Sequence, residues 1–467
     1  MKNLKYVGIL AAILLLQSCF VAKDYTRPAE VVNENFYRTD ALPEDSLSLA
    51  NVSWQEIFTD EKLAGYIETG LANNLDIRIA LQNISAAEAY VKMGRSGYFP
   101  TLNGSAAYSH STQSLHTPLG SLGGNERQYV NQYEIGGNLS WEADIWGKIR
   151  SNDRAFRANY LQSVAAHQAV KSELVAAIAS TYFQLLAYDE QRRITTETIA
   201  NREQGLETMV LLKDAGNVTE VAVKQTEAQL LNAQALLLDI ENNIKLLENT
   251  FSILLGENPK SIDRNEFAAQ EIRIDLNAGV PVQLLANRPD VMAAEYGLIN
   301  AFELTNVARS QFYPSLRLTA NGGIQSIDFE DLFSVNSLFA SIVGSLTQPI
   351  LNGRQIRTEY EVSQARQEAA FLNYKKTILL ASKEVSDALY TYRTNEEKIQ
   401  LKQGEYEAYR QAIVYSEELQ AYGMANYLEV LTARENALNA QLNLIMTQYG
   451  RLNAVVQLYR ALGGGWR

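Results

Sequence analysis

Four segments of the chain alternate between apolar and polar positions. In residues 133–142 the odd positions are Tyr, Ile, Gly, Leu and Trp, and the even positions are Glu, Gly, Asn, Ser and Glu. A period of two predicts β-strands, and we place them at about 101–112, 129–143, 315–326 and 338–348. One apolar and one polar face over about ten residues is typical of outer-membrane strands. The alternative is a soluble sheet with one solvent-exposed face.

Two long segments predict helices of unusual length. No proline occurs from 119 to 258 or from 350 to the end, and Gly205 and Gly404 are the only glycines within 149–212 and 354–422. A continuous helix over either range would be roughly 100 Å long. In the second, a stripe recurs at alternating spacings of three and four from Ile378 to Ile413, which favours coiled-coil packing.

The chain is an internal duplication. The segment around Asp76 and Pro100 aligns without a gap on that around Asp290 and Pro314, 214 residues later, whereas later matches such as Gly216 and Gly423 are 207 apart. We therefore divide the chain into a first repeat, 73–278, and a second, 279–467. In each repeat a helix (288–311 in the second) precedes two strands and a long helix, about 149–212 or 354–422. A last helix, about 218–256 or 426–462, completes the repeat.

The N-terminus indicates export and lipidation. Residues 1–18 have the basic head, short apolar run and small-residue cleavage site of a signal peptide. Cys19, the only cysteine, follows Leu16-Gln17-Ser18, which resembles a bacterial lipobox. We expect lipidation at Cys19 and a lipid-anchored N-terminal segment over 19–72; an ordinary signal peptide with a chance cysteine is the alternative.

Composition argues against several classes of function. The net charge of −12 disfavours a nucleic-acid binder. With three histidines and one cysteine, no His/Cys metal cluster or cysteine dyad can be built. The glycines at 463–465 follow a helix and lack a phosphate-loop lysine. We expect no enzyme, no catalytic residue, no metal and no cofactor.

Counting strands predicts self-assembly. Four strands cannot close a barrel, and the smallest transmembrane barrels have about eight. Two copies would give eight strands with a filled interior, and three would give twelve with room for a lumen. Polar inward faces favour three copies.

Together these features resemble the TolC-like outer-membrane factor family, in particular its lipoprotein branch that serves resistance-nodulation-division efflux pumps. The segments that carry the resemblance are Cys19 with Asp24-Tyr-Thr-Arg-Pro28, Trp54-Gln-Glu-Ile-Phe58, Asn287-Arg-Pro-Asp-Val291, Phe312-Tyr-Pro-Ser-Leu316, Leu346-Thr-Gln-Pro-Ile-Leu-Asn-Gly353 and Leu458-Tyr-Arg-Ala-Leu-Gly-Gly-Gly-Trp466.

The resemblance implies a mainly α fold with transmembrane β structure. Long coiled-coil helices would form a trimeric α-barrel in the periplasm, continuous with a 12-stranded β-barrel in the outer membrane, with four strands from each protomer. It also implies a periplasmic adaptor and an inner-membrane resistance-nodulation-division transporter as partners. We expect a passive exit duct for small molecules; a type I protein secretion channel or a non-channel coiled-coil surface lipoprotein is the alternative.

The resemblance also places a gate and a docking surface at the ends of the long helices. An aspartate often present in relatives is replaced here by Val414, so the acidic gate is not carried over directly. The gate candidates are Arg410, Tyr415, Glu417, Glu418 and Tyr422, and solvated helix-face charges are the alternative. The candidate adaptor-docking turns are Gly216, Asn217, Val218, Gly423, Met424, Ala425 and Asn426.

Overall fold

The computed structural model describes residues 21–28, 52–112, 114–118, 129–270 and 284–467. The chain divides into two compact units, one of residues 1–27, 84–162 and 295–373, the other of residues 28–83, 163–294 and 374–467. Each unit takes segments from both repeats. Two helices of 67 residues, α5 (Lys148–Asp214) and α9 (Gln355–Ala421), begin in the first unit and end in the second. The compact units therefore cut across the duplication seen in the sequence.

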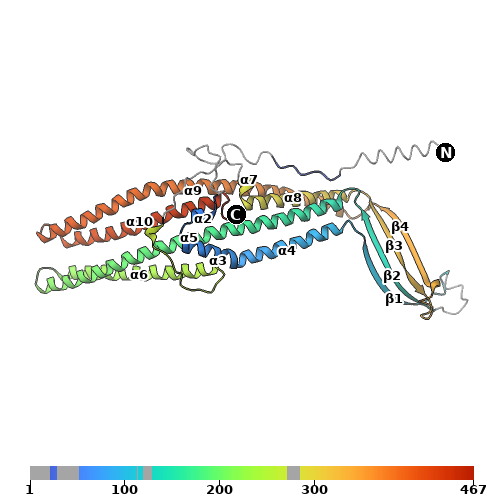
Figure 1. Cartoon of the computed structure of the whole chain (residues 1–467), viewed down its shortest axis with the longest axis horizontal. Coiled ribbons are helices and arrows are strands. Elements are labelled where there is room, and N and C mark those ends of the chain that lie inside the picture. Colours follow the sequence, from blue (N-terminus) through green and yellow to red (C-terminus); the bar gives the residue numbers. More distant parts are fainter. Residues whose placement is uncertain (1–20, 29–51, 113, 119–128, 271–283) are drawn as a thin grey trace. The chain divides into compact units, whose positions relative to one another are not determined.

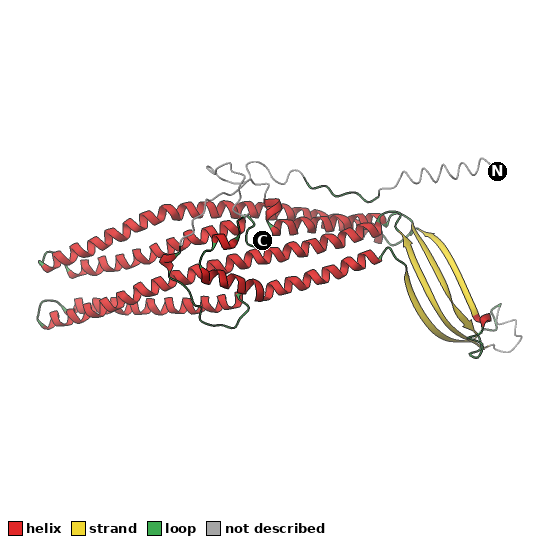
Figure 2. Cartoon of the chain, viewed as in Figure 1, coloured by secondary structure: helices red, strands yellow, loops and turns green. Residues whose placement is uncertain are grey.

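The first unit contains one antiparallel sheet in the order β1-β2-β3-β4 (Figure 1). Its strands are β1 (Thr101–Thr112), β2 (Tyr129–Ala143), β3 (Ser315–Ser326) and β4 (Leu338–Thr347). The four strands of the predicted fold class are present, and the central pair β2–β3 joins the two repeats (Figure 2).

The strand register aligns the apolar positions of all four strands on one face. Leu139 lies opposite Leu102 and Ala320, and Ala320 lies opposite Ile342. On the other face, Asn138 donates a hydrogen bond to Asn321. A one-residue slip would reverse both faces, so the observed register preserves the alternation read from the sequence.

The remaining helices follow the duplicated plan. The helices before the strands are α4 (Leu75–Ser96) and α8 (Pro289–Ser310), and α7 (Leu284–Asn287) precedes α8. The long helices are followed by α6 (Glu220–Leu254) and α10 (Tyr427–Ala461), and 3₁₀ turns lie at Phe267–Ala269 and Val335–Ser337. None of the helices in the described ranges is long and apolar enough to span a membrane.

Two further helices lie in the segment expected only as an anchored N-terminus. They are α2 (Trp54–Ile57) and α3 (Glu61–Asn73), and Asp60 caps α3 by accepting hydrogen bonds from two backbone amides of its first turn. Phe58 lies between them with its ring 6.3 Å from that of Phe183 and 6.2 Å from that of Tyr459. The segment thus forms part of the aromatic core of the second unit.

The C-terminal ends of α6 and α10 use the same backbone arrangement. Gly256 and Gly463 follow these helices with φ of +73° and +95°. A Cβ on Gly256 would lie 2.5 Å from the carbonyl oxygen of Asn73, and one on Gly463 would lie 2.4 Å from that of Asn287. Glycine is required at both positions because the backbones approach so closely.

Candidate functional site

The two turns that join the long helices to their successors have the same geometry. Gly216 and Gly423 have φ of +79° and +72°. The amide of Asn217 donates to the carbonyl of Leu212 at 2.9 Å, and that of Met424 donates to the carbonyl of Leu419 at 2.8 Å. Each turn is a Schellman motif, in which a left-handed glycine satisfies the last carbonyls of the helix.

The first turn is closed by an ion pair. Lys213 Nζ lies 2.9 Å from Glu220 Oε2, joining the end of α5 to the start of α6. The hydrogen bond from Lys213 lowers the pKa of Glu220, and the same contact raises the pKa of Lys213. Both side chains are exposed to solvent, which screens the pair strongly. The candidate docking residues Gly216, Asn217 and Val218 lie between its two members.

The second turn carries apolar and aromatic side chains where the first carries charges. Tyr422 and Met424 are 80% and 77% exposed. Asn426 begins α10 by accepting a hydrogen bond from the amide of Leu428 at 3.2 Å, and Ala425 is half-buried between them. The two predicted docking turns therefore present different chemistry on one backbone shape.

Four of the gate candidates lie near the C-terminal end of α9 and Tyr422 directly follows the helix, but the structure does not bring them into one network within a chain. Arg410 is bidentate to Glu407, at 2.8 Å and 2.7 Å, on its own helix. Glu417 accepts a hydrogen bond from Arg434 of α10 at 2.6 Å. Tyr415 and Glu418 are exposed, with Tyr415 at 61%. Glu417 is thus the only candidate that an ion pair ties to the neighbouring helix among the described residues.

A buried arginine between the two helix pairs was not anticipated from the sequence. Arg202 of α5, only 6% exposed, donates to the backbone carbonyl of Gln229 on α6. Its other nitrogen donates to Glu435 of α10 at 2.7 Å. Removing one partner of such a pair leaves an uncompensated buried charge, so Arg202 fixes three helices near the turns. Its partners are distant in the sequence, which gave no local signal.

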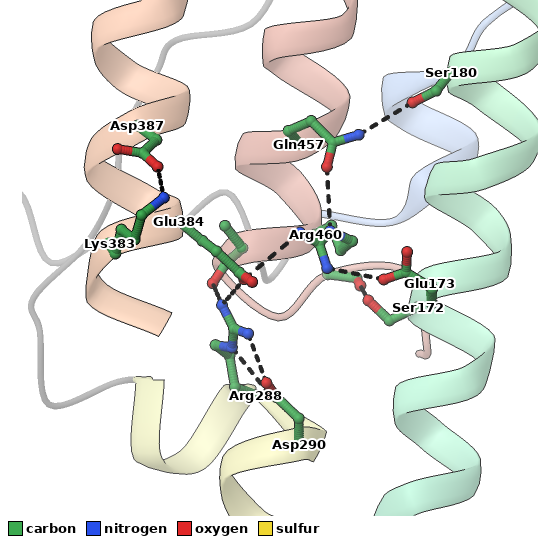
Figure 3. Close-up of polar contacts among 12 residues, drawn as sticks. Ser172, Glu173, Ser180, Arg288, Asp290, Lys383, Glu384, Asp387, Gln457 and Arg460 are labelled. Atoms are coloured by element: carbon green, nitrogen blue, oxygen red, sulfur yellow. Dashed lines mark hydrogen bonds and ion pairs between the residues drawn. The ribbon is translucent and has the colours of Figure 1, made fainter. Parts of the chain in front are cut away.

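Arg288, from the segment Asn287-Arg-Pro-Asp, forms a second buried node (Figure 3). It is bidentate to Asp290 at 3.0 Å and 2.6 Å, and it donates to Glu384 of α9 at 2.8 Å and to the carbonyl of Ala461 at 2.9 Å. Burial opposes the charge, yet the contacts with Asp290 and Glu384 raise the pKa of Arg288 above its ordinary value. Arg288 therefore joins α8, α9 and the end of α10.

Cys19 lies outside the described residues, but the segment that follows is held in place. Asn306 of α8 accepts a hydrogen bond from the Lys23 amide at 3.1 Å and donates to the Lys23 carbonyl at 2.9 Å. Arg27 is bidentate to Glu295 at 2.6 Å and 2.7 Å. Pairing both backbone groups of one residue fixes the path of the chain a few residues after Cys19.

No group of three or more His, Cys, Asp or Glu side chains with metal-binding geometry occurs in the part of the chain that the structure describes. The polar clusters around the turns are pairs of a lysine or arginine with a carboxylate, which hold helices together and position charge.

Two helix pairs with glycine turns, joined to an antiparallel sheet with an uncovered apolar face, define the protomer of an outer-membrane channel. The chain matches the model of the family described as outer membrane efflux protein over residues 66–257 and 280–464. It belongs to that family, and the predicted resemblance is confirmed.

Individual relatives cover almost the whole chain. The chain is 30% identical to the cation efflux system protein CusC of Escherichia coli K12 over 461 residues, and 29% identical to the solvent efflux pump outer membrane protein SrpC of Pseudomonas putida over 460. Each comparison covers 97% of both chains. The solved structure of CusC matches with a TM-score of 0.83 at 27% identity, over 96% of this chain and 100% of that one. The outer-membrane channel OprN matches with a TM-score of 0.87 at 24% identity, over 96% and 100%.

The fold class and the function predicted from the sequence are therefore confirmed. The chain is an outer-membrane channel component of an efflux pump, and the family consists of channel proteins rather than enzymes.

Proposed function

We propose that three copies of this chain form a passive exit duct for small molecules. An inner-membrane resistance-nodulation-division transporter supplies the energy, and a periplasmic adaptor joins it to the duct. The adaptor docks on the turns at Gly216 and Gly423 and opens the closed end by shifting helix packing there.

The uncovered sheet is the observation that carries self-assembly. Its outer strands β1 and β4 each pair with one neighbour only, within the described residues. Its apolar face is open, with Leu102, Ile342 and Leu346 at 73%, 75% and 68% exposure. Open edges and a large apolar face are both costly in water. Edge-to-edge joining of copies in lipid satisfies both, and three copies leave room for a lumen.

The closed end is proposed to lie at the last turns of α9. Three-fold symmetry would repeat Glu417 and Glu418 as rings of carboxylates, with Arg410, Tyr415 and Tyr422 around them. Rings of like charge attract cations and constrict a pore. The Arg434–Glu417 contact at 2.6 Å supports a role for Glu417 in holding the helices together.

Organic molecules are the proposed cargo. The polar face of the sheet is mainly neutral, with Asn103, Asn138, Ser140, Asn321 and Ser341 aligned on it by the strand register. Copper and silver exporters often use clustered methionines, whereas the six methionines here are scattered and the first belongs to the predicted signal. A neutral polar wall suits passage of solvents or drugs without tight binding.

Lipidation of Cys19 is proposed to anchor the assembly. The two hydrogen bonds between the Asn306 side chain and the Lys23 backbone support this proposal, because they fix the path of the chain a few residues after Cys19. Cys19→Ser is expected to abolish incorporation of labelled palmitate while the polypeptide is still exported. Continued labelling of the variant would exclude Cys19 as the acyl site.

Deletion of the gene tests the duct as a whole. The deletion strain is expected to accumulate a fluorescent efflux dye and to regain efflux when the wild-type chain is supplied. Unchanged dye accumulation, together with loss of a secreted polypeptide from the medium, would replace this proposal by the protein-secretion alternative.

A further inference from the structure

The polar face of the sheet carries three charged side chains within the described strands, Glu134 and Glu142 of β2 and Arg317 of β3. Glu142 is paired, with its carboxylate 2.9 Å from Lys148 Nζ and 3.2 Å from a guanidinium nitrogen of Arg317. Glu134 is half-buried and makes no hydrogen bond or ion pair with any residue that the structure describes. The polar face of these strands therefore has one unpaired charge, the carboxylate of Glu134.

A row of glycines crosses the sheet beside Glu134. The strand register places Gly136 of β2 opposite Gly323 of β3, and Gly323 opposite Phe339 of β4 (Figure 1). A Cβ on Gly323 would lie 2.2 Å from the carbonyl oxygen of Ile135, so no side chain fits there. Phe339 is the only aromatic residue on the polar face of the described strands, and the bare backbone of β3 lets its ring extend toward β2.

The ring and the carboxylate converge over Gly136. A Cβ on Gly136 would lie 3.6 Å from Cζ of Phe339 and 3.8 Å from Oε1 of Glu134. An aromatic ring from β4 and a carboxylate oxygen from β2 thus both come within 4 Å of one point. Because glycine has no side chain, the backbone between the two groups is left bare, and any larger residue at position 136 would meet both of them.

The corresponding place in the duplication lacks both groups. Offsets of 214 between β1 and β3 and of 207 between β2 and β4 preserve the strand pairing of the two repeats. They make Gln132 the counterpart of Phe339 and Ser341 the counterpart of Glu134. Both counterparts are neutral and neither is aromatic. The pairing of ring and carboxylate therefore occurs once in each chain, although the sheet is built from two similar halves.

We propose that Glu134 and Phe339 form a binding site, on the wall of the duct, for organic cations that carry aromatic rings. The carboxylate attracts the positive charge, and the face of the phenyl ring binds both a cation and a stacked aromatic ring. The bare backbone at Gly136 gives a flat molecule room to lie between them. The inference rests on the proposed duct, since the polar face lines a lumen only in the assembled copies, and it adds a class of cargo.

Block of single-channel current by ethidium, a planar aromatic cation, tests the site in planar bilayers. Phe339→Gln and Glu134→Ser each install the residue that the duplication has at the corresponding position on the same face, so the strand pattern is kept. Each variant is expected to raise the half-blocking concentration of ethidium about three- to tenfold. Phe339→Leu, which keeps an apolar side chain but removes the ring, is expected to weaken the block as much as Phe339→Gln.

A second probe separates charge from ring. Tetrabutylammonium is a cation without an aromatic ring, so Glu134→Ser is expected to weaken its block whereas Phe339→Gln leaves it unchanged. Val343→Gln is the matched control, because Val343 is an apolar residue on the same face of β4, opposite Thr319 and away from the row of glycines. This variant is expected to leave the block by both probes unchanged.

The outcomes distinguish the site from the duct. A wild-type chain that conducts, with an ethidium block that neither Phe339→Gln nor Glu134→Ser weakens, would overturn the site and leave the duct standing. Equal weakening of both probes by Phe339→Gln, or full ethidium block in Phe339→Leu, would also overturn the site, because the side chain would then act through its size and not through its ring. A wild-type monomer without conductance would overturn both proposals.

Discussion

The two turns at the ends of the long helices share a backbone and differ in their side chains. Gly216 and Gly423 have nearly the same φ, +79° and +72°, but an ion pair of Lys213 and Glu220 closes the first turn, while Tyr422 and Met424 stand exposed at the second. Turn geometry depends on one glycine, so it survives duplication easily. Side chains at the surface are freer to diverge, and the adaptor proposed to dock on both turns would therefore meet two different surfaces.

The C-terminal ends of α6 and α10, which are buried, also share a backbone arrangement and differ in the side chains that contact them. Asn74 donates to the carbonyl of Leu254 at 2.9 Å, and its counterpart Arg288 donates to the carbonyl of Ala461 at the same distance. The longer arginine also reaches Glu384. The second repeat has thus added a charged link to α9 on top of a shared helix cap.

The largest expected loss of stability comes from removing the contacts of Arg288. Arg288→Met should lower the free energy of unfolding by about 3–5 kcal/mol, because it removes charge-assisted hydrogen bonds to Asp290 and Glu384 and the donor to the carbonyl of Ala461. Asn74→Ala, which removes only neutral hydrogen bonds, should cost about 1–2 kcal/mol. Denaturant unfolding of the two variants compares the ends directly, and equal losses would mean that the charge adds nothing to the shared cap.

The next largest difference in unfolding free energy is expected between variants of Gly463 and Gly423. Gly463→Ala should cost about 3 kcal/mol, since a Cβ would lie 2.4 Å from a backbone oxygen at a positive φ. Gly423→Ala, at a similar φ but with open space around it, should cost only about 1 kcal/mol. Thermal unfolding measures both. A Gly423 variant as unstable as the Gly463 variant would show that backbone conformation alone, and not crowding, sets the cost.

Charge removal at the second turn should change conductance more than stability. Glu417→Gln together with Glu418→Gln is expected to raise single-channel conductance by loosening the contact with Arg434, while the unfolding free energy changes by less than about 1 kcal/mol because the pair is partly exposed. Asp387→Asn, which breaks the pair with Lys383 on the same helix about eight turns earlier, is the matched control. Equal conductance in both variants would return the two glutamates to solvated helix-face charges.

The smallest effect is a pH dependence confined to the first turn. The lowered pKa of Glu220 means that the pair stabilises the turn above the ordinary glutamate value of 4.5 and stops doing so as pH falls through the lowered value. The raised pKa of Lys213 preserves the pair up to and somewhat beyond 10.5. Amide exchange of residues 213–220, corrected for intrinsic rates, should therefore quicken in acid, and in a Lys213→Met variant that acid step should disappear.

Local patterns in the sequence predict most of the fold. Alternation of apolar and polar residues predicts where the strands lie. It also excludes pairings shifted by an odd number of residues, which would put Leu139 and Leu102 on opposite faces. Missing proline and glycine indicated the long helices. The cap of Asp60 on α3 is also a local signal, present in the sequence but not used.

The contacts of the candidate site could not be predicted from local sequence patterns. Arg202 meets Glu435 and Arg288 meets Glu384 across 233 and 96 residues, and only the packing of separate helices brings them together. Glu417 is predictable as a candidate from its place near Gly423, but its contact with Arg434 depends on the register of α9 on α10.

Single-channel conductance of the purified wild-type chain in a planar bilayer, with its mass measured in the same detergent, tests the central claim most directly. We predict a three-fold protomer mass and discrete, cation-preferring openings of low conductance that rise when Glu417 and Glu418 are neutralised. A monomer without conductance would contradict the account, because the open edges and the exposed apolar face of the sheet would then have no second copy to cover them.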